Sequence, residues 1–302
     1  MIDFTKLPTK KKMYAGANGS KICVLYEGEA YMLKFPAKPT KNKEISYSNS
    51  CMSEYIGCKI FESVGLPVQE TVLGTYTTSK GNIKIVVGCK DFATDGKVLQ
   101  DFASLKNQII DSERNGYGTE LDDILRTFEE QTAIDPQVIS KRFWDMFIVD
   151  AFIGNWDRHN GNWGFLYDDK TDEMTLAPIF DCGSSLFPQA DEEMMKNILA
   201  DDKEIDARIF EIPTSAIRHK DSRINYYSFI SSLENKDCNL ALNRIVPQID
   251  MNKIASIIDE IPVISDIQKQ FYKTMLNARK ERILDFSLNK YINKKRKKEQ
   301  ER

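Results

Sequence analysis

Alternation of apolar and polar residues predicts two pairs of β-strands in the first third of the chain. The runs 21–26 and 30–35 are rich in β-branched and aromatic residues, and the polar turn around Gly28 predicts a hairpin. Two further strand-like runs, 68–76 and 82–89, flank a second polar turn. Together these runs predict a small β-rich region.

Apolar residues recur at helical spacing between the two strand pairs. They run through 48–64, and Gly65 marks the end of this helix. A longer helix is predicted to begin at Asp135 and Pro136, because Asp is a favoured N-cap and Pro a favoured first helical residue. It continues through a strongly apolar segment to Gly154.

After residue 92 the pattern becomes mostly helical. Short strands are predicted at 162–166 and 174–177, and beyond Asp181 the pattern predicts only helices and loops. Strands and helices are therefore segregated along the chain, which predicts an α+β fold. The expected domains are a β-rich N-terminal lobe over 1–92 that ends in a connector, a mostly helical lobe over 93–289, and a basic tail.

The formal net charge of the 302 residues is −3, but it is unevenly distributed. The tail, 290–302, carries seven Lys or Arg and two Glu, so it sums to +5 and the rest of the chain to −8. Because an acidic body repels polyanions, we expect no specific nucleic-acid binding. The cluster 294–298 is interpreted as the solvated end of a helix, where cations are favourable. The alternatives are contact with an import receptor, an anionic surface or a nucleic acid.

The cysteines, histidines and N-terminus narrow the class of protein. Six cysteines without a C-x-x-C pair, together with two histidines, argue against a structural zinc site and a secreted disulfide scaffold. The N-terminus lacks the apolar segment of a signal peptide, and no apolar run is long enough to cross a membrane. We expect reduced thiols and a cytoplasmic protein.

Candidate chemistry begins with a glycine-containing turn and two charged residues. The turn GANGSK at 16–21 precedes the first strand of the hairpin. Its backbone N–H groups can bind phosphate, although ordinary turns share this composition. Lys34 lies on a predicted strand and Glu54 on the following helix. Each fits a solvated surface residue, but a strand lysine followed by a helix glutamate also orients nucleotide phosphates in protein kinases.

Two more motifs follow the long helix. Asp157 and Asn162 have the D-x-x-x-x-N spacing of a phosphotransferase catalytic loop, in which the Asp receives the proton of the attacking hydroxyl and the Asn binds a metal ion. Asp181 ends a short strand and Gly183 follows it, which is the layout of a D-F-G metal-binding segment. A polar loop after a helix and an Asp-x-Gly turn are the ordinary structural interpretations of these segments.

Phosphoryl transfer from ATP explains all of these motifs and their order. Mg²⁺ keeps most of its waters and needs few protein ligands, so Asn162 and Asp181 suffice to hold it. Lys34 would neutralise phosphate charge, and Asp157 would act on the acceptor hydroxyl. The sequence therefore predicts a phosphotransferase that uses ATP and Mg²⁺.

Segments along nearly the whole chain resemble the HipA-like serine/threonine protein kinases. Among them are GANGSK, YMLKFP, VQETVLGTY, CKDF, GNWDRHNGNWGFL and APIFDCGSS. The resemblance implies a two-lobed protein-kinase-like fold. It also implies transfer of the γ-phosphoryl group of Mg-ATP to a serine or threonine hydroxyl of a protein substrate, with autophosphorylation.

The resemblance further implies a role for each candidate site residue. Asp157 is the expected catalytic base, and Asn162 and Asp181 are the expected metal ligands. The expected nucleotide-binding residues form the loop over the phosphates, the phosphate-binding lysine with its helix acid, and the part of the connector that faces adenine. They are Gly16, Asn18, Gly19, Ser20, Lys21, Lys34, Glu54, Lys90 and Phe92.

Some family properties are not carried over from this resemblance. The chain is shorter than full HipA toxins and starts close to the glycine turn, so we do not extend the resemblance to a DNA-binding antitoxin partner. Secretion without a signal peptide and entry into a host-cell nucleus rest on the resemblance alone.

Three other functions account for part of the pattern. The segment 157–162 is also similar to the catalytic loop of phosphatidylinositol kinases, so a lipid headgroup is the alternative acceptor. A catalytically silent binding module of the same fold would not need the complete set of charged motifs. A nuclease that uses His159 and Asn160 would leave Lys34 and Asp181 without a role.

Overall fold

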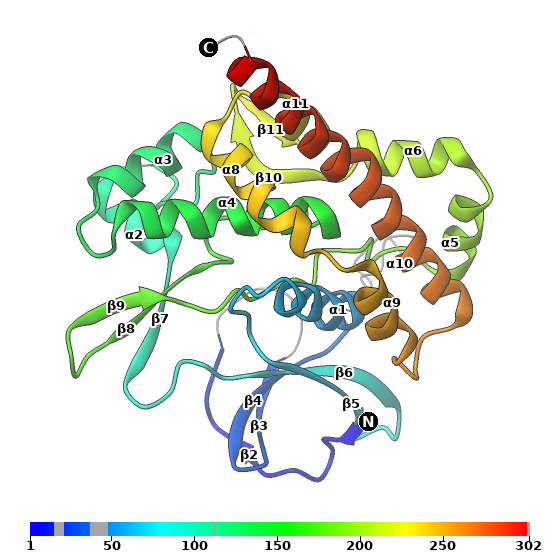
Figure 1. Cartoon of the computed structure of the whole chain (residues 1–302). Coiled ribbons are helices and arrows are strands. Elements are labelled where there is room, and N and C mark those ends of the chain that lie inside the picture. Colours follow the sequence, from blue (N-terminus) through cyan, green and yellow to red (C-terminus); the bar gives the residue numbers. More distant parts are fainter. Residues whose placement is uncertain (15–20, 37–47, 111–112, 301–302) are drawn as a thin grey trace.

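The structure is a computed structural model that describes residues 1–14, 21–36, 48–110 and 113–300. In Figure 1, a curved sheet at the N-terminal end carries one helix, and the rest of the chain is mostly helical. Within the described ranges the strand order of this sheet is β1-β5-β6-β4-β3-β2. Its strands are β1 (Ile2–Asp3), β2 (Thr9–Lys10), β3 (Lys21–Tyr26), β4 (Glu29–Lys34), β5 (Thr71–Thr77) and β6 (Ile83–Lys90).

The predicted hairpin is confirmed as β3 and β4. Positive φ angles at Glu27 (52°) and Gly28 (83°) allow a tight two-residue turn whose twist matches that of the strands. The register places Lys21 opposite Lys34, and Lys34 opposite Val87 of β6. Lys34 is therefore the last residue of a strand that is paired on both sides.

The helix predicted over 48–64 is confirmed as α1 (Ser50–Ser63). Its apolar residues, such as Ile56 and Ile60, are fully buried, and Gly65 ends the helical turn with a φ of 76°. Figure 1 shows α1 lying between the sheet and the long helix α4 (Pro136–Ile153). This position lets α1 present residues to both parts of the chain.

Helix α4 is the centre of the C-terminal part. As predicted, Asp135 caps it, with Oδ1 accepting a 2.8 Å hydrogen bond from the backbone N of Gln137, and Gly154 ends it with a φ of 65°. Every residue from Phe143 to Ile153 is buried. The other α-helices are α2 (Phe102–Ile109), α3 (Leu121–Glu130), α5 (Glu192–Leu199), α6 (Asp202–Phe210), α7 (Tyr226–Ser232), α8 (Lys236–Ile245), α9 (Met251–Asp259), α10 (Asp266–Arg279) and α11 (Phe286–Gln300).

The C-terminal helices lie along one side of the molecule. A π-helical turn, Lys280–Asp285, joins α10 to α11, and Figure 1 shows the two running as one long path towards the C-terminus. Residues 293–300 of α11 are exposed, in agreement with the predicted solvated helix end. Among the helices of the described ranges, none has both the length and the apolar character that crossing a bilayer requires.

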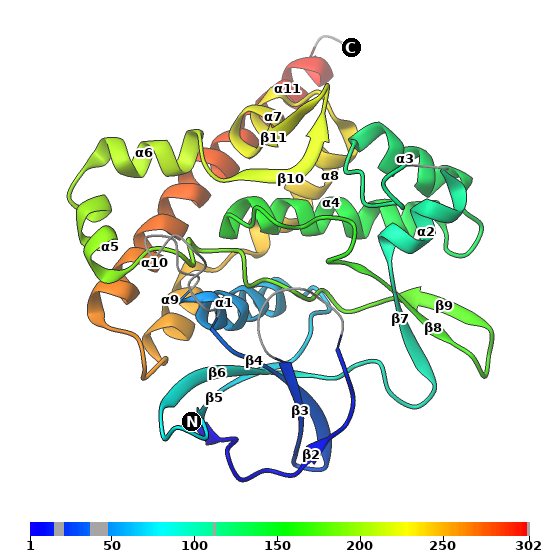
Figure 2. The same ribbon diagram turned by 180° about the vertical axis from the view of Figure 1, so that it is seen from behind.

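A second, three-stranded sheet projects from the side of the molecule, as Figures 1 and 2 show. It consists of β7 (Lys97–Asp101), β8 (Gly164–Asp168) and β9 (Glu173–Leu176), paired antiparallel in that order. The two short strands after α4 were predicted, but β7 was not, and it lies in a region that was expected to be mostly helical. Because β7 is an exposed edge strand, its residues lack the apolar alternation that marks a half-buried strand.

The prediction that only helices and loops follow Asp181 is wrong. A hairpin of β10 (Thr214–His219) and β11 (Ser222–Asn225) lies between α6 and α7. Its turn is made by Lys220 and Asp221, which have positive φ angles of 52° and 62° without the glycine that usually marks such a turn. The hairpin therefore carried no turn signal in the sequence.

The core extends from α1 into the helical part, with a smaller apolar cluster around Phe4 on the other side of the sheet. Gly74 makes room for this cluster, since a Cβ atom there would lie 2.3 Å from Cε2 of Phe4. All six cysteines are free and buried.

Candidate active site

Lys34, Glu54 and Asp181 come together although they are far apart in the sequence. Nζ of Lys34 lies 2.8 Å from Oδ1 of Asp181 and 3.0 Å from Oε2 of Glu54. Glu54 is buried on α1, whereas the Asp181 side chain keeps 41% of its surface exposed. The last residue of β4 thus connects α1 to the segment that follows β9.

The electrostatics of this cluster keep Lys34 and Asp181 charged. Burial lowers the pKa of Lys34, but the carboxylates of Asp181 and Glu54 outweigh it and raise that pKa well above its usual value. Burial alone would raise the pKa of Asp181, yet the Lys34 ammonium lowers it to about 2. At neutral pH the Lys34 ammonium and the Asp181 carboxylate therefore form an ion pair.

The backbone around Asp181 is shaped to present its carboxylate. Asp181 has a φ of 60°, in the left-handed region, and the buried side chain of Cys182 fixes the next position. Cys182 packs on Gly57 of α1, where a Cβ atom would lie 2.7 Å from Cβ of Cys182. A Cβ atom on Gly183 would lie 3.1 Å from Oε2 of Glu54. Small residues at these positions thus let α1 and the Asp181 segment approach closely.

A buried ion pair anchors the loop that follows α4. Nε of Arg158 lies 2.9 Å from Oδ2 of Asp150, and its Nη1 donates to the carbonyls of Asn162, at 2.9 Å, and of Phe180. Burial lowers the pKa of Arg158, but Asp150 raises it above its usual value, so the side chain stays charged. This guanidinium joins α4 to both candidate metal-binding segments.

Neither Asp150 nor Arg158 was predicted to have a role. The available signal was Asp150 itself, a lone acid that interrupts an otherwise apolar helix face. Such an acid is stable in a core only with a buried partner. Identifying Arg158 as that partner required the folded geometry of the loop.

Asp157 and Asn162 occupy the same loop and contact each other. Nδ2 of Asn162 donates to the carbonyl of Asp157 at 2.8 Å, and Oδ1 of Asn155 accepts from the backbone N of Asp157 at 3.1 Å. Burial and the charge of Asp181 raise the pKa of the Asp157 carboxyl, while the charge of His159 opposes them. Asp157 is therefore a better proton acceptor than an ordinary solvated aspartate.

The connector residues Lys90 and Phe92 lie at the end of β6 and just after it. The backbone N of Lys90 donates to the carbonyl of Glu70 at 2.9 Å, and its carbonyl accepts from Nε2 of Gln69 at 2.9 Å. The Phe92 ring lies 5.8 Å from the ring of Phe180, the residue before Asp181.

Part of the predicted phosphate loop can be placed. Lys21 begins β3 opposite Lys34, and its pKa is lowered by burial and by the Lys34 charge. Gly16, Asn18, Gly19 and Ser20 lie outside the described residues.

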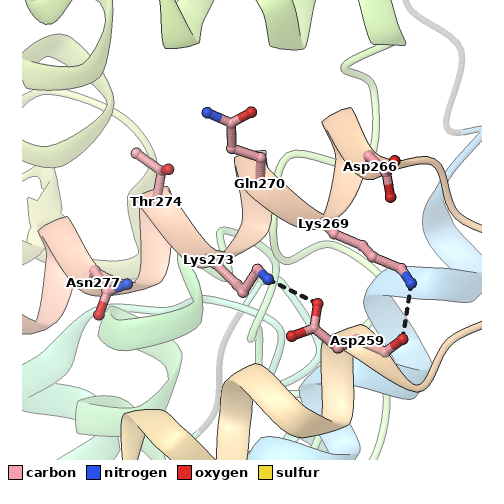
Figure 3. Close-up of a pocket in the computed structure, with 7 residues that line it drawn as sticks. All are labelled: Asp259, Asp266, Lys269, Gln270, Lys273, Thr274 and Asn277. Atoms are coloured by element: carbon pink, nitrogen blue, oxygen red, sulfur yellow. Dashed lines mark hydrogen bonds and ion pairs between the residues drawn. The ribbon is translucent and has the colours of Figure 1, made fainter.

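A polar groove between α9 and α10 lies apart from these residues. It has a volume of about 300 Å³, and Figure 3 shows its lining side chains. Lys273 lies 2.7 Å from a carboxylate oxygen of Asp259, and Lys269 donates to the carbonyl of Asp259 at 2.8 Å. Both ammonium groups are already paired within the groove, which contains none of the candidate site residues. The lining residues are Asp259, Asp266, Lys269, Gln270, Lys273, Thr274 and Asn277.

Comparison with known proteins identifies relatives over nearly the full length. The serine/threonine-protein kinase CtkA of Helicobacter pylori strain J99 is 50% identical over 96% of this chain and 89% of its own. The crystal structure of the proinflammatory kinase CtkA of Helicobacter pylori has a TM-score of 0.91 and covers 97% of this chain and 98% of that one, also at 50% identity.

A more distant structure shares the fold. It is the HipA toxin of Shewanella oneidensis MR-1, solved with HipB and operator DNA. Its TM-score is 0.58 at 17% identity, with 92% of this chain and 67% of that chain covered. The predicted α+β, two-lobed kinase-like fold and the predicted kinase enzyme are confirmed by these matches. Residues 11–263 match the model of the HipA-like C-terminal domain, and the chain therefore belongs to the HipA-like family.

Proposed function

We propose that this chain is an ATP-dependent serine/threonine protein kinase that transfers the γ-phosphoryl group of Mg-ATP to a protein hydroxyl and also phosphorylates itself. The observation that carries the proposal is the contact of Lys34 with both Glu54 and Asp181, beside the loop of Asp157. The name of the 50% identical relative, a serine/threonine-protein kinase, supports a protein hydroxyl as the acceptor. The expected lobes, 1–92 and 93–289, would enclose the nucleotide between them.

The side chains fit the metal that the proposal requires. Nδ2 of Asn162 is engaged with the Asp157 carbonyl, so Oδ1 is the atom left to bind a cation. With a carboxylate oxygen of Asp181 it offers two hard oxygen ligands, which suits Mg²⁺. When bound, Mg²⁺ would neutralise charge on the phosphate oxygens.

The remaining residues have complementary roles in this proposal. Lys34 would contact the phosphates, and Glu54 would fix its position. Asp157 would accept the proton of the acceptor hydroxyl, aided by its raised pKa. The turn 16–21 would cover the phosphates, and Lys90 and Phe92 would face adenine.

The test is phosphate transfer by the purified full-length chain. We expect incubation with Mg-ATP labelled in the γ-phosphate to label the chain itself and a protein acceptor, on serine or threonine, as identified by mass spectrometry. Asp157→Asn and Asp181→Ala should abolish the labelling. Anionic lipid vesicles containing phosphatidylinositol serve as a parallel acceptor. Labelling of lipid alone, or unchanged labelling by Asp157→Asn, would disprove the proposal.

A further inference from the structure

Tyr117 is an exposed aromatic residue on a turn with a firmly held backbone. Its surface is 53% exposed, yet Nδ2 of Asn160 donates to the carbonyls of both Gly116 and Gly118 at 2.8 Å. Gly116 has a φ of 78°, and a Cβ atom there would lie 1.8 Å from the carbonyl oxygen of Ala103. Only glycine fits at Gly116, so the sequence keeps a tight backbone beneath a ring that gains little from burial. A ring held in place before binding loses little entropy when it contacts a partner.

This turn lies beside the catalytic loop. Asn160 itself belongs to the loop, and the Tyr117 ring lies edge-on to the ring of His159 with centroids 6.2 Å apart. A Cβ atom on Gly161 would lie 2.9 Å from Cε1 of Tyr117. The ring therefore contacts the segment between Asp157 and Asn162.

A carboxylate accompanies the ring. Asp101 ends β7 opposite Gly164, and its Oδ1 caps α2 by accepting from the backbone N of Ser104 at 2.8 Å and from its Oγ at 2.6 Å. Among the residues that the structure describes, Oδ2 receives one long hydrogen bond, 3.4 Å from the Tyr117 hydroxyl. Across the described ranges, no Lys or Arg lies within ion-pair distance of Asp101. Its charge is the main cause that raises the pKa of Tyr117.

An aromatic ring next to a carboxylate is suited to a cation. The face of the ring attracts an ammonium or guanidinium group, and the carboxylate adds a charged hydrogen-bond acceptor. The phosphates of a nucleotide would be repelled by Asp101, whereas a basic segment is attracted by a body that carries a net charge of −8 outside the tail. The chemistry therefore favours a basic side chain of the acceptor as the occupant.

Building on the proposed kinase function, we propose that Tyr117 and Asp101 form a recognition site for a Lys or Arg side chain near the hydroxyl that is phosphorylated. Such a site would determine specificity and would leave the chemical step unchanged. It would lower KM for acceptors with a correctly spaced basic residue.

The experiment is a positional scan with serine peptides that carry Arg, Lys, Ala or Glu at each position around the serine. We expect the full-length wild type to favour a basic residue at one or more positions by about fivefold in kcat/KM, through KM. Asp101→Asn, which retains a capping oxygen for α2, and Tyr117→Ala should each remove most of this preference. Tyr117→Phe keeps the ring and should retain most of it.

A matched control comes from the same small sheet. Tyr167 on β8 also donates its hydroxyl to an aspartate, Asp172, at 2.9 Å, but this pair lies at the turn between β8 and β9, at the opposite end of β8 from Gly164. Tyr167→Ala should leave the peptide preference unchanged. An equal loss in this variant would overturn the proposal, because the effect would then arise from the sheet as a whole.

The remaining outcomes separate this inference from the proposed function. A wild type that phosphorylates peptides without any preference for basic residues overturns the recognition site and leaves the kinase function standing. A raised KM for ATP in Asp101→Asn, with the peptide preference intact, overturns the site by assigning the carboxylate to the nucleotide. A wild type that transfers no phosphate to any acceptor refutes the kinase function, and the recognition site with it.

Discussion

At the scale of single residues, Lys34 has the surroundings that bear most directly on phosphate binding. We expect Lys34→Met to lower the rate of phosphoryl transfer by about a hundredfold or more, because the variant removes the ammonium that Glu54 and Asp181 hold in place for the phosphates. The matched control is Lys273→Met, since Lys273 is also paired with a carboxylate, at 2.7 Å, but lies in the groove of Figure 3. Initial rates of labelled phosphate transfer measure both variants. A phosphoryl-transfer rate of Lys34→Met close to that of Lys273→Met would contradict the phosphate-binding role of Lys34.

Asp181 makes the stability of the folded protein depend on pH in the acidic range. Its pKa is lowered from 3.8 to about 2 in the folded state by Lys34, although burial opposes this. A carboxyl group whose pKa is lower in the folded state stabilises the protein at pH values above its unfolded-state pKa. This stabilisation is lost as the pH falls towards the folded-state pKa. In metal-free buffer, wild type should therefore exceed Asp181→Asn in urea midpoint at about pH 5, and this difference should shrink towards about pH 3. If the difference in urea midpoint stayed constant with pH, the Lys34–Asp181 ion pair would not be its source.

Residue types were predictable where a motif fixes both identity and spacing. Asp157 and Asn162 were predicted from their spacing together with the order of the other motifs and the family resemblance, and the structure places the two residues in contact. Two kinds of contact could not be predicted from the sequence. The pair Lys34–Asp181 joins residues 147 positions apart. The role of Arg158 depends on four partners, Asp150, Asn162, Phe180 and Cys182, that only the folded loop brings together.

At the scale of elements, the contact between α1 and the Asp181 segment depends on Gly57. A methyl group there would overlap Cβ of Cys182, so Gly57→Ala should push α1 away and misplace Glu54. We expect a loss of about 1–3 kcal/mol in the free energy of unfolding, together with reduced phosphoryl transfer. Urea unfolding and transfer rates measure the two effects. The double variant Gly57→Ala with Cys182→Gly removes the overlapping atom and should recover part of both losses. If the effects of the two substitutions simply added, this explanation would be refuted.

Helix α4 carries two buried acids whose partners differ. Asp150 pairs with Arg158, which is 3% exposed, so Asp150→Asn leaves a cation without its counter-charge in the core. We expect it to cost about 3–5 kcal/mol in the free energy of unfolding. Asp145 is equally buried, but Lys141 and Arg244 reach it from the surface, with 59% and 35% of their side chains exposed. Asp145→Asn should therefore cost clearly less, and equal losses in urea unfolding would contradict the comparison.

Elements were predictable where their signals are local. The β3–β4 hairpin has a glycine turn, and α1 and α4 have apolar periodicity with glycine at the C-terminal end. Strand β7 and the β10–β11 hairpin lacked such signals, because the first is an exposed edge and the second turns on Lys220 and Asp221. The conformation of these strands depends on the strands with which they pair, which are distant in the sequence or irregularly paired, rather than on their own composition.

At the scale of the whole molecule, the basic tail leaves the core after Tyr291, which still packs against it. Residues 293–300 are exposed, whereas Ile283 and Leu284 further back are fully buried. Deletion of 294–302 should change the free energy of unfolding by less than about 0.5 kcal/mol and leave phosphoryl transfer intact. The control deletion, which begins at Ile283, should destabilise the fold strongly. A large loss from the shorter deletion, measured by urea unfolding, would show that the tail supports the fold.

The burial of all six cysteines has a practical consequence. Burial raises the pKa of the Cys51 thiol to about 12, and buried thiols that stay protonated react slowly with alkylating reagents. A cysteine introduced at an exposed position, such as Val98 on β7 or Ile83 on β6, would then be the fastest-reacting thiol of the chain. Spectroscopic probes can therefore be attached at chosen pairs of sites, and distances between the sheet and the helical part followed in solution, while every native cysteine stays in place.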